Sequence, residues 1–170
     1  RAEVSVDDAR APPVQVPHAI VGGDPLPFIN RFPELVENLP ELETAARGRG
    51  LFTVRPDPDG VYRRIPVVMS VEGQLRLGLG PEMLRVASGG APFAVRVNEA
   101  GIDGVVLAGQ LVRTAADGTV RPYLNASNAD RFISAADLLN DRVPKGRLAG
   151  HLLFVGTSAI GLEDYRATPL

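Results

Sequence analysis

The sequence predicts an α/β fold with a mixed central sheet flanked by helices and an antiparallel meander; an α+β arrangement is the alternative. The apolar run HLLFVG at residues 151–156 is typical of a central strand that is buried on both faces. Short β-rich runs over residues 93–124, divided by Gly, Asn and Asp, predict the meander. Three helix-start signals, near Asn38, Pro81 and Ser134, are spread along the chain.

Composition limits the classes of protein to which the chain can belong. Its 170 residues are expected to form a single domain, residues 1–170. The net charge is −2 and no stripe of Lys and Arg is present, so nucleic acid is not an expected partner. Cysteine is absent, which excludes disulfides, thiolate metal sites and a cysteine nucleophile. No apolar run approaches the ~20 residues of a membrane span.

The first elements along the chain are an extended lead-in, a strand and a helix. Residues 1–17 mix charges with three prolines and are expected to have little regular structure. The sequence HAIVG offers a short strand. Asn38 is placed as an N-cap, followed by Pro40 and by Glu41 at the capping-box position. A helix over residues 39–47, ended by Gly48, is therefore expected.

The next stretch, LFTVRPDPDGVYRRIPVV at residues 51–68, predicts a β-hairpin because a Pro/Gly turn divides two β-rich runs. Strand alternation places Arg63 on the apolar side of the second run, where a charge needs a partner. Asp57 and Asp59 are close enough in sequence to supply one, and Asp164 is another option. The arrangement is either a structural clasp or an anion pocket involving Arg63 or Arg64.

The elements that follow are a helix, the meander and a final helix–strand pair. The sequence GPEMLRVASGG predicts a short helix with Met83, Leu84 and Ala87 on its packed face and a Gly pair as its end. Residues 116–119 predict a tight turn. Ser134 is expected to cap the helix in SAADLL, with Asp137 at the capping-box position. The strand at residues 151–156 follows.

The end of that strand, Gly156-Thr157-Ser158, resembles the edge of an α/β sheet where ligands bind. A serine nucleophile is poorly supported because Ile160 replaces the second Gly of the G-x-S-x-G motif. His151 lies at the other end of the strand, roughly 20 Å from Ser158. A phosphate loop, a calcium loop at the Asp57 turn and a zinc site each lack most of the required residues. No acid–base pair is placed for catalysis.

Several segments, in this order, resemble one known family. They are AARGRGLF, DPDGVYRRIP, VRPYL, FISAADLL and GTSAIGLEDYRATPL. Together they resemble the CHASE domain of type two, the extracytoplasmic sensor of bacterial adenylate cyclases, histidine kinases, serine/threonine kinases and diguanylate cyclases. The resemblance runs from about Glu41 to Leu170 and implies that the chain is the C-terminal portion of such a sensor. The residues that carry the pattern are Asp57, Asp59, Gly60, Arg63, Arg64, Pro66, Gly156, Thr157, Ala159, Gly161, Asp164, Thr168 and Pro169.

The resemblance implies a non-enzymatic input module in the periplasmic part of an inner-membrane receptor. Its partner would be a small-molecule or protein signal, the membrane would be reached only through flanking segments, no cofactor is implied, and a homodimer is left open. The alternatives are a hydrolase that uses Ser158 or the acid cluster, and a structural or dimerising module. We expect the acidic hairpin and the GTSAIGLED loop to meet, with Arg63 or Arg64 contacting Asp164. The candidate ligand-binding residues are Asp57, Asp59, Arg63, Arg64, Thr157, Ser158 and Asp164.

Overall fold

The structure is a computed structural model that describes residues 16–126, 128–157 and 167–169. The chain groups into two compact units. The larger unit comprises the described residues of Arg1–Arg55 and Arg64–Arg121, and the smaller unit comprises those of Pro56–Arg63 and Pro122–Leu170. A single domain over residues 1–170 stays a prediction. Most of the expected lead-in, residues 1–17, lies outside the described residues.

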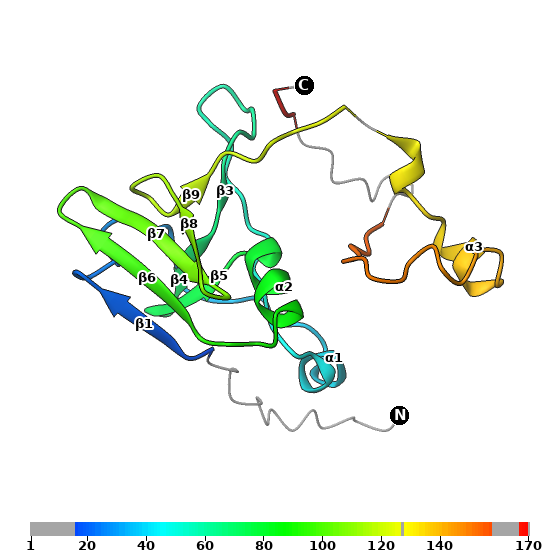
Figure 1. The fold of residues 1–170 in the computed structure, drawn as a ribbon. Helices are drawn as coiled ribbons and strands as arrows, with labels where there is room; N and C mark the ends of the chain where they lie inside the picture. Colours follow the sequence, from blue (N-terminus) through cyan, green and yellow to red (C-terminus); the bar gives the residue numbers. More distant parts are fainter. Residues whose placement is uncertain (1–15, 127, 158–166, 170) are drawn as a thin grey trace, which may run out of the picture. The chain divides into compact units, whose positions relative to one another are not determined.

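A four-stranded mixed sheet in the larger unit contains the predicted meander (Figure 1). Strands β6 (Phe93–Asn98), β7 (Gly101–Leu107) and β8 (Gln110–Arg113) pair antiparallel in sequence order. Strand β1 (His18–Val21) lies parallel to β6 at the sheet edge. The predicted strand in HAIVG and the mixed character of the sheet are therefore confirmed.

Two smaller sheets complete the strands of this unit. In one, β4 (Val68–Val71) pairs parallel with β2 (Arg31–Phe32) and antiparallel with β5 (Gln74–Leu77). In the other, β3 (Ile65–Pro66) pairs antiparallel with β9 (Thr119–Val120). The predicted run VRPYL thus contributes only its first residue to a strand.

One apolar core joins the strands of the larger unit. In β6, every second residue from Phe93 onward is buried, as expected for a strand with one face on the core. Strands β4 and β5 contribute side chains to the same cluster. The buried residues of this core are Ile29, Val67, Val68, Leu75, Leu77, Phe93, Val95, Val97, Ile102, Val105 and Leu107.

The first helix, α1 (Pro40–Ala45), forms where the sequence predicts it, but with a different cap. Leu39, not Asn38, occupies the N-cap position. Glu43 reaches back instead of Glu41, because its Oε1 accepts hydrogen bonds from the backbone N–H of Asn38 at 3.1 Å and from the side-chain amide of Asn38 at 2.8 Å. Asn38 thus supports the start of α1 as a hydrogen-bond donor to Glu43, and not as the predicted N-cap residue.

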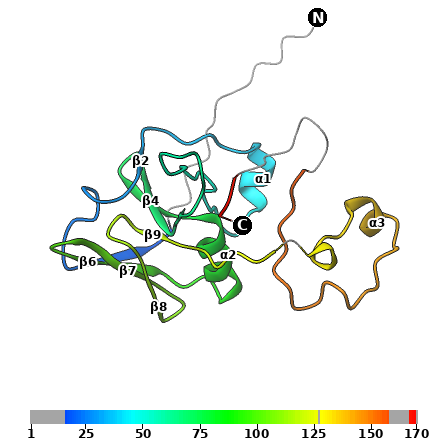
Figure 2. The same ribbon diagram turned by 90° about the horizontal axis from the view of Figure 1, so that it is seen from above.

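The second helix, α2 (Leu79–Ala87), lies next to the strands of the larger unit in both views (Figures 1 and 2). The predicted helix is confirmed, but the expectation for its packed face is wrong. Leu84 and Ala87 are exposed, whereas Glu82 and Arg85 are buried. Glu82 and Arg85 lie three residues apart on one face of the helix. They are buried as ions because each neutralises the charge of the other.

The predicted hairpin is correct in its turn and wrong in its pairing. Gly60 donates its backbone N–H to the carbonyl of Asp57 at 2.9 Å and has a φ of +81°, a value that favours glycine. The flanking runs do not pair with each other. Leu51 forms an isolated bridge with Gly78, and Ile65–Pro66 pairs with β9. Residues 56–63 therefore form a loop that belongs to the smaller unit.

The smaller unit contains short helical elements. They are a 3₁₀ turn, η1 (Ala129–Arg131), and the helix α3 (Ala135–Leu139). Ser134 is the N-cap residue of α3, as predicted, although its side chain makes no capping hydrogen bond.

The expected buried strand at residues 151–156 is wrong. Residues 151–157 form no strand, and their side chains are exposed, with Phe154 at 70% and Val155 at 97%. A strand requires a hydrogen-bonded neighbour, and within the described part of the chain no strand pairs with this segment. An apolar run predicts burial only where a partner is present.

Candidate ligand-binding site

The acidic loop, Pro56–Arg63, is folded by its own backbone and side chains. The N–H of Asp57 donates to the carbonyl of Val61 at 2.9 Å, which closes the loop above the turn at Gly60. The N–H of Val61 donates to Oδ1 of Asp59 at 3.1 Å. Aspartate commonly accepts a backbone amide two residues further along in this way. The loop conformation thus fixes the direction of the Asp59 carboxylate.

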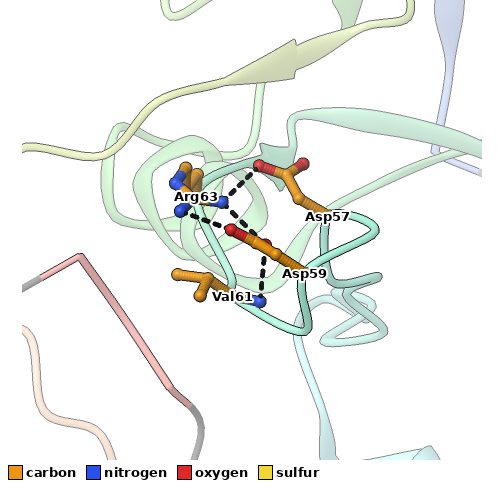
Figure 3. A network of polar contacts seen from close by, with 4 residues as sticks. All are labelled: Asp57, Asp59, Val61 and Arg63. Atoms are coloured by element: carbon orange, nitrogen blue, oxygen red, sulfur yellow. Dashed lines mark hydrogen bonds and ion pairs between the residues drawn. The ribbon is translucent and has the colours of Figure 1, made fainter.

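Arg63 lies between the two acids and donates to both (Figure 3). Its Nη1 and Nη2 contact Oδ1 and Oδ2 of Asp59 at 2.9 Å and 2.8 Å, the fork geometry of a strong charge-assisted pair. Nη1 also donates to Oδ2 of Asp57 at 3.1 Å. The predicted pairing of Arg63 with Asp57 and Asp59 is therefore confirmed.

The pairing changes the acidity of the groups in the loop. Hydrogen bonds from Arg63, together with the Val61 amide, lower the pKa of Asp59 from 3.8 to about 2. Hydrogen bonds to Asp59 and Asp57 raise the pKa of Arg63. Asp59 therefore stays ionised, and Arg63 stays protonated, at neutral pH.

These contacts bear on the choice between a clasp and an anion pocket. Both terminal nitrogens of Arg63 already donate to carboxylates, so an incoming anion must compete with Asp57 and Asp59. The side chain of Arg63 is 35% exposed, so such an exchange is sterically open. Arg64 is exposed and belongs to the larger unit. The geometry is that of a clasp that an external ligand can reach.

Among the described residues, a backbone hydrogen bond joins the C-terminal segment to the acidic loop. The N–H of Tyr62 donates to the carbonyl of Ala167 at 2.8 Å, so the loop and the end of the GTSAIGLEDYRATPL segment lie side by side. Thr157 is exposed. Ser158 and Asp164 lie outside the described residues, and with them the expected contact of Asp164 with Arg63 or Arg64.

Sequence reasoning missed a buried ion pair on α2. Nε and Nη2 of Arg85 donate to the two carboxylate oxygens of Glu82, each at 2.8 Å, and Nη1 donates to the carbonyls of Gly90 and Ala91. The hydrogen bonds to Glu82 raise the pKa of Arg85. The spacing of three residues on a helix was the available signal. The pair ties α2 to the turn that follows it.

A second charge pair, between buried Glu43 and partly buried Arg49, lies at the end of α1. Glu43 forms an ion pair with Nε of Arg49, and Arg49 also donates through Nη2 to the carbonyl of Glu43 at 3.2 Å. Hydrogen bonding from Asn38 and the charge of Arg49 lower the pKa of Glu43. This network satisfies the end of a short helix and contains no nucleophile or acid–base pair.

Neither metal-binding clusters nor membrane spans are present in the described residues. Within residues 16–126, 128–157 and 167–169, no three His, Cys, Asp or Glu side chains come together in a way that suits a metal ion. Over the same residues, no helix has the length and apolar character needed to cross a bilayer.

Comparison with known proteins identifies the family. The model of the CHASE2 domain matches residues 8–170, which is nearly the whole chain. No curated protein and no solved structure matched. The match extends the sequence resemblance, which began near Glu41, toward the N-terminus. The acidic loop, the buried sheets and the C-terminal segment all lie within it, and the chain belongs to the CHASE2 family of extracytoplasmic sensory domains.

Proposed function

We propose that the chain is the non-enzymatic input domain of a membrane-bound bacterial receptor whose effector is a cyclase or a kinase. The observation that carries this proposal is the CHASE2 match over residues 8–170. A domain of this kind works outside the cytoplasm, in the periplasmic part of an inner-membrane protein. Sensing requires that the signal bind one conformation better than another.

The acidic loop is the part of the site best suited to such a change. Arg63 holds two acids through polar contacts only, and its guanidinium is partly exposed. A ligand that draws Arg63 away from Asp59 would loosen a carboxylate that also accepts the amide of Val61. The neighbouring Tyr62 contacts Ala167, so the movement would reach the C-terminal segment. The ligand-binding role of Asp57, Asp59, Arg63, Arg64, Thr157, Ser158 and Asp164 is part of this proposal.

The test uses the intact receptor and measures its second-messenger or phosphorylation output. Arg63→Gln removes the charge of the clasp, and we expect the output to change in level or in response. Arg113→Gln is the matched control, because Arg113 is also exposed and paired with an aspartate, Asp103, at 3.1 Å. An output that is the same in both variants and in the parent receptor would contradict a role for the loop in sensing.

The non-enzymatic part of the proposal has a separate test. The chain is assayed against generic esters and phosphoesters, and no turnover is expected. Turnover that disappears in Ser158→Ala or Asp164→Ala would support the hydrolase alternative instead. A chain that neither turns over substrates nor gains melting temperature with any small anion or metabolite would favour a structural or dimerising module.

A further inference from the structure

A hollow of about 490 Å³ lies in the smaller unit, between η1, α3 and the loop after α3. Its volume falls in the range of small-molecule sites, about 300–1,000 Å³. Part of its lining is apolar, from Phe132, Ile133 and Val143. Phe132 is 73% exposed, so its ring is available to a ligand. The acidic loop contributes nothing to this lining.

Backbone contacts close the loop around the hollow. The N–H of Arg142 donates to the carbonyl of Asp137 at 2.8 Å, and the N–H of Arg147 donates to the carbonyl of Pro144 at 2.9 Å. The guanidinium of Arg147 donates through Nη2 to the carbonyl of Asp130, which joins the loop to η1. The walls of the hollow are therefore connected to each other and not merely adjacent.

Charges of both signs line the hollow. The arginines Arg142 and Arg147 and the aspartates Asp130 and Asp137 are among its lining residues. Arg142 is 68% exposed and reaches Asp137 only at 3.4 Å, a long hydrogen bond. Among the described residues, the side-chain carboxylate of Asp130 has no hydrogen-bond partner. The hollow is therefore bordered by arginine donors and by an aspartate acceptor that has no hydrogen-bond partner among the described residues.

We propose that this hollow binds a small zwitterion of the amino-acid class, with its carboxylate on Arg142 and Arg147 and its ammonium on Asp130. An anion alone would lie beside two carboxylates, and a cation alone would lie beside two guanidinium groups, so a ligand with both charges is favoured over either. The apolar part of the lining accommodates a side chain. The inference names a ligand class for the proposed sensory role and rests on that role.

The experiment is isothermal titration calorimetry of the chain with the free L-amino acids, each as a separate probe. Acetate and methylamine carry one charge each and serve as the single-charge probes. We expect at least one amino acid to bind at least about tenfold more tightly than either, since each charge-assisted hydrogen bond contributes on that order. Binding of acetate or methylamine as tightly as of every amino acid would overturn the inference, as would no binding of any amino acid.

Variants locate the site. Arg142→Gln is expected to weaken the amino acid at least about tenfold. Arg131→Gln is the matched control, because Arg131 lies in the same 3₁₀ turn as Asp130 but does not line the hollow. Equal affinities for the two variants would overturn the inference. Should Arg142→Gln fail to fold by circular dichroism, Asp130→Asn replaces it with the same expectation.

The intact receptor separates this inference from the proposed function. A receptor that answers its signal equally well with and without Asp130→Asn refutes the zwitterion site and leaves the sensory role standing. The opposite result is also possible. If the chain binds an amino acid through Arg142 but the output of the receptor never depends on the domain, the site is supported and the sensory role is refuted.

Discussion

The two units differ in what holds them together. Among the described residues, every strand and every buried apolar side chain of the core belongs to the larger unit. The smaller unit is held by turns, ion pairs and two short helical elements, and it exposes apolar side chains such as Phe154. Core packing and strand pairing resist local change, whereas polar contacts near solvent can be exchanged. The smaller unit therefore has the properties expected of a responsive part.

The comparison is tested most strongly by truncating one phenylalanine in each unit. Phe93 is 2% exposed in the core of the larger unit, so Phe93→Ala is expected to lower the free energy of unfolding by about 4 kcal/mol. Phe132→Ala, at an exposed position of the smaller unit, is expected to change it by less than about 0.5 kcal/mol. Urea unfolding followed by circular dichroism measures both values. Similar losses in the two variants would break the comparison.

The next largest effect is expected from arginines with aspartate or glutamate partners. Arg85→Ala leaves the buried carboxylate of Glu82 without its partner and is expected to cost about 3 kcal/mol. Arg142→Ala removes an exposed ion pair with Asp137 and is expected to cost at most about 1 kcal/mol. The same unfolding experiment applies. Restoration of stability by Glu82→Gln in the Arg85→Ala background would show that the unpaired charge is the cause.

Glycine substitutions give a smaller difference in the same direction. A Cβ added at Gly101 would lie 2.5 Å from the carbonyl oxygen of Ala116 at a φ of +131°, so Gly101→Ala is expected to cost about 2 kcal/mol. Gly60 also has a positive φ, but a Cβ there meets nothing within 4 Å. Gly60→Ala is expected to cost about 1 kcal/mol, from backbone strain alone. Thermal melting in parallel ranks the two, and a larger loss for Gly60→Ala would contradict the packing argument.

The smallest effect is a pH dependence confined to the acidic loop. The pKa of Asp59 is lowered from 3.8 to about 2 in the folded chain, so the native state binds fewer protons than the unfolded state in this range. The contribution of Asp59 to stability is therefore complete above about pH 4 and is lost as the pH falls toward 2. Carboxyl titration by nuclear magnetic resonance measures the pKa, and in Arg63→Gln it is expected to return toward 3.8. An unchanged value in that variant would show that Arg63 is not the cause.

Sequence patterns predicted the elements whose signals are local. The alternation in β6, the turn at Gly60 and the helix after Ser134 each depend on a few neighbouring residues, and each is present. The pairing of Arg63 with Asp57 and Asp59 was likewise predictable, because the three residues share one short loop.

Features that depend on distant partners were not predictable in the same way. The run at residues 151–156 has the composition of a buried strand, yet it is exposed and unpaired among the described residues. Ile65–Pro66 pairs with β9, more than fifty residues further along by number, and not with its sequence neighbours. The buried face of α2 carries Glu82 and Arg85. Hydropathy alone predicts that both residues are exposed, but their mutual ion pair allows them to be buried.

The smaller unit is assembled from two stretches of chain, Pro56–Arg63 and Pro122–Leu170, with most of the larger unit encoded between them. No single cut in the gene can therefore isolate it, since a fragment that starts at Pro122 loses Arg63 and the amide that reaches Ala167. Conversely, the acidic loop connects Arg55 to Arg64, which both belong to the larger unit. A protease that cleaves the loop therefore also cuts the chain of the larger unit. The assembly order at the ribosome also follows, because the loop emerges early and must wait for Ala167 to be synthesised before that hydrogen bond can form.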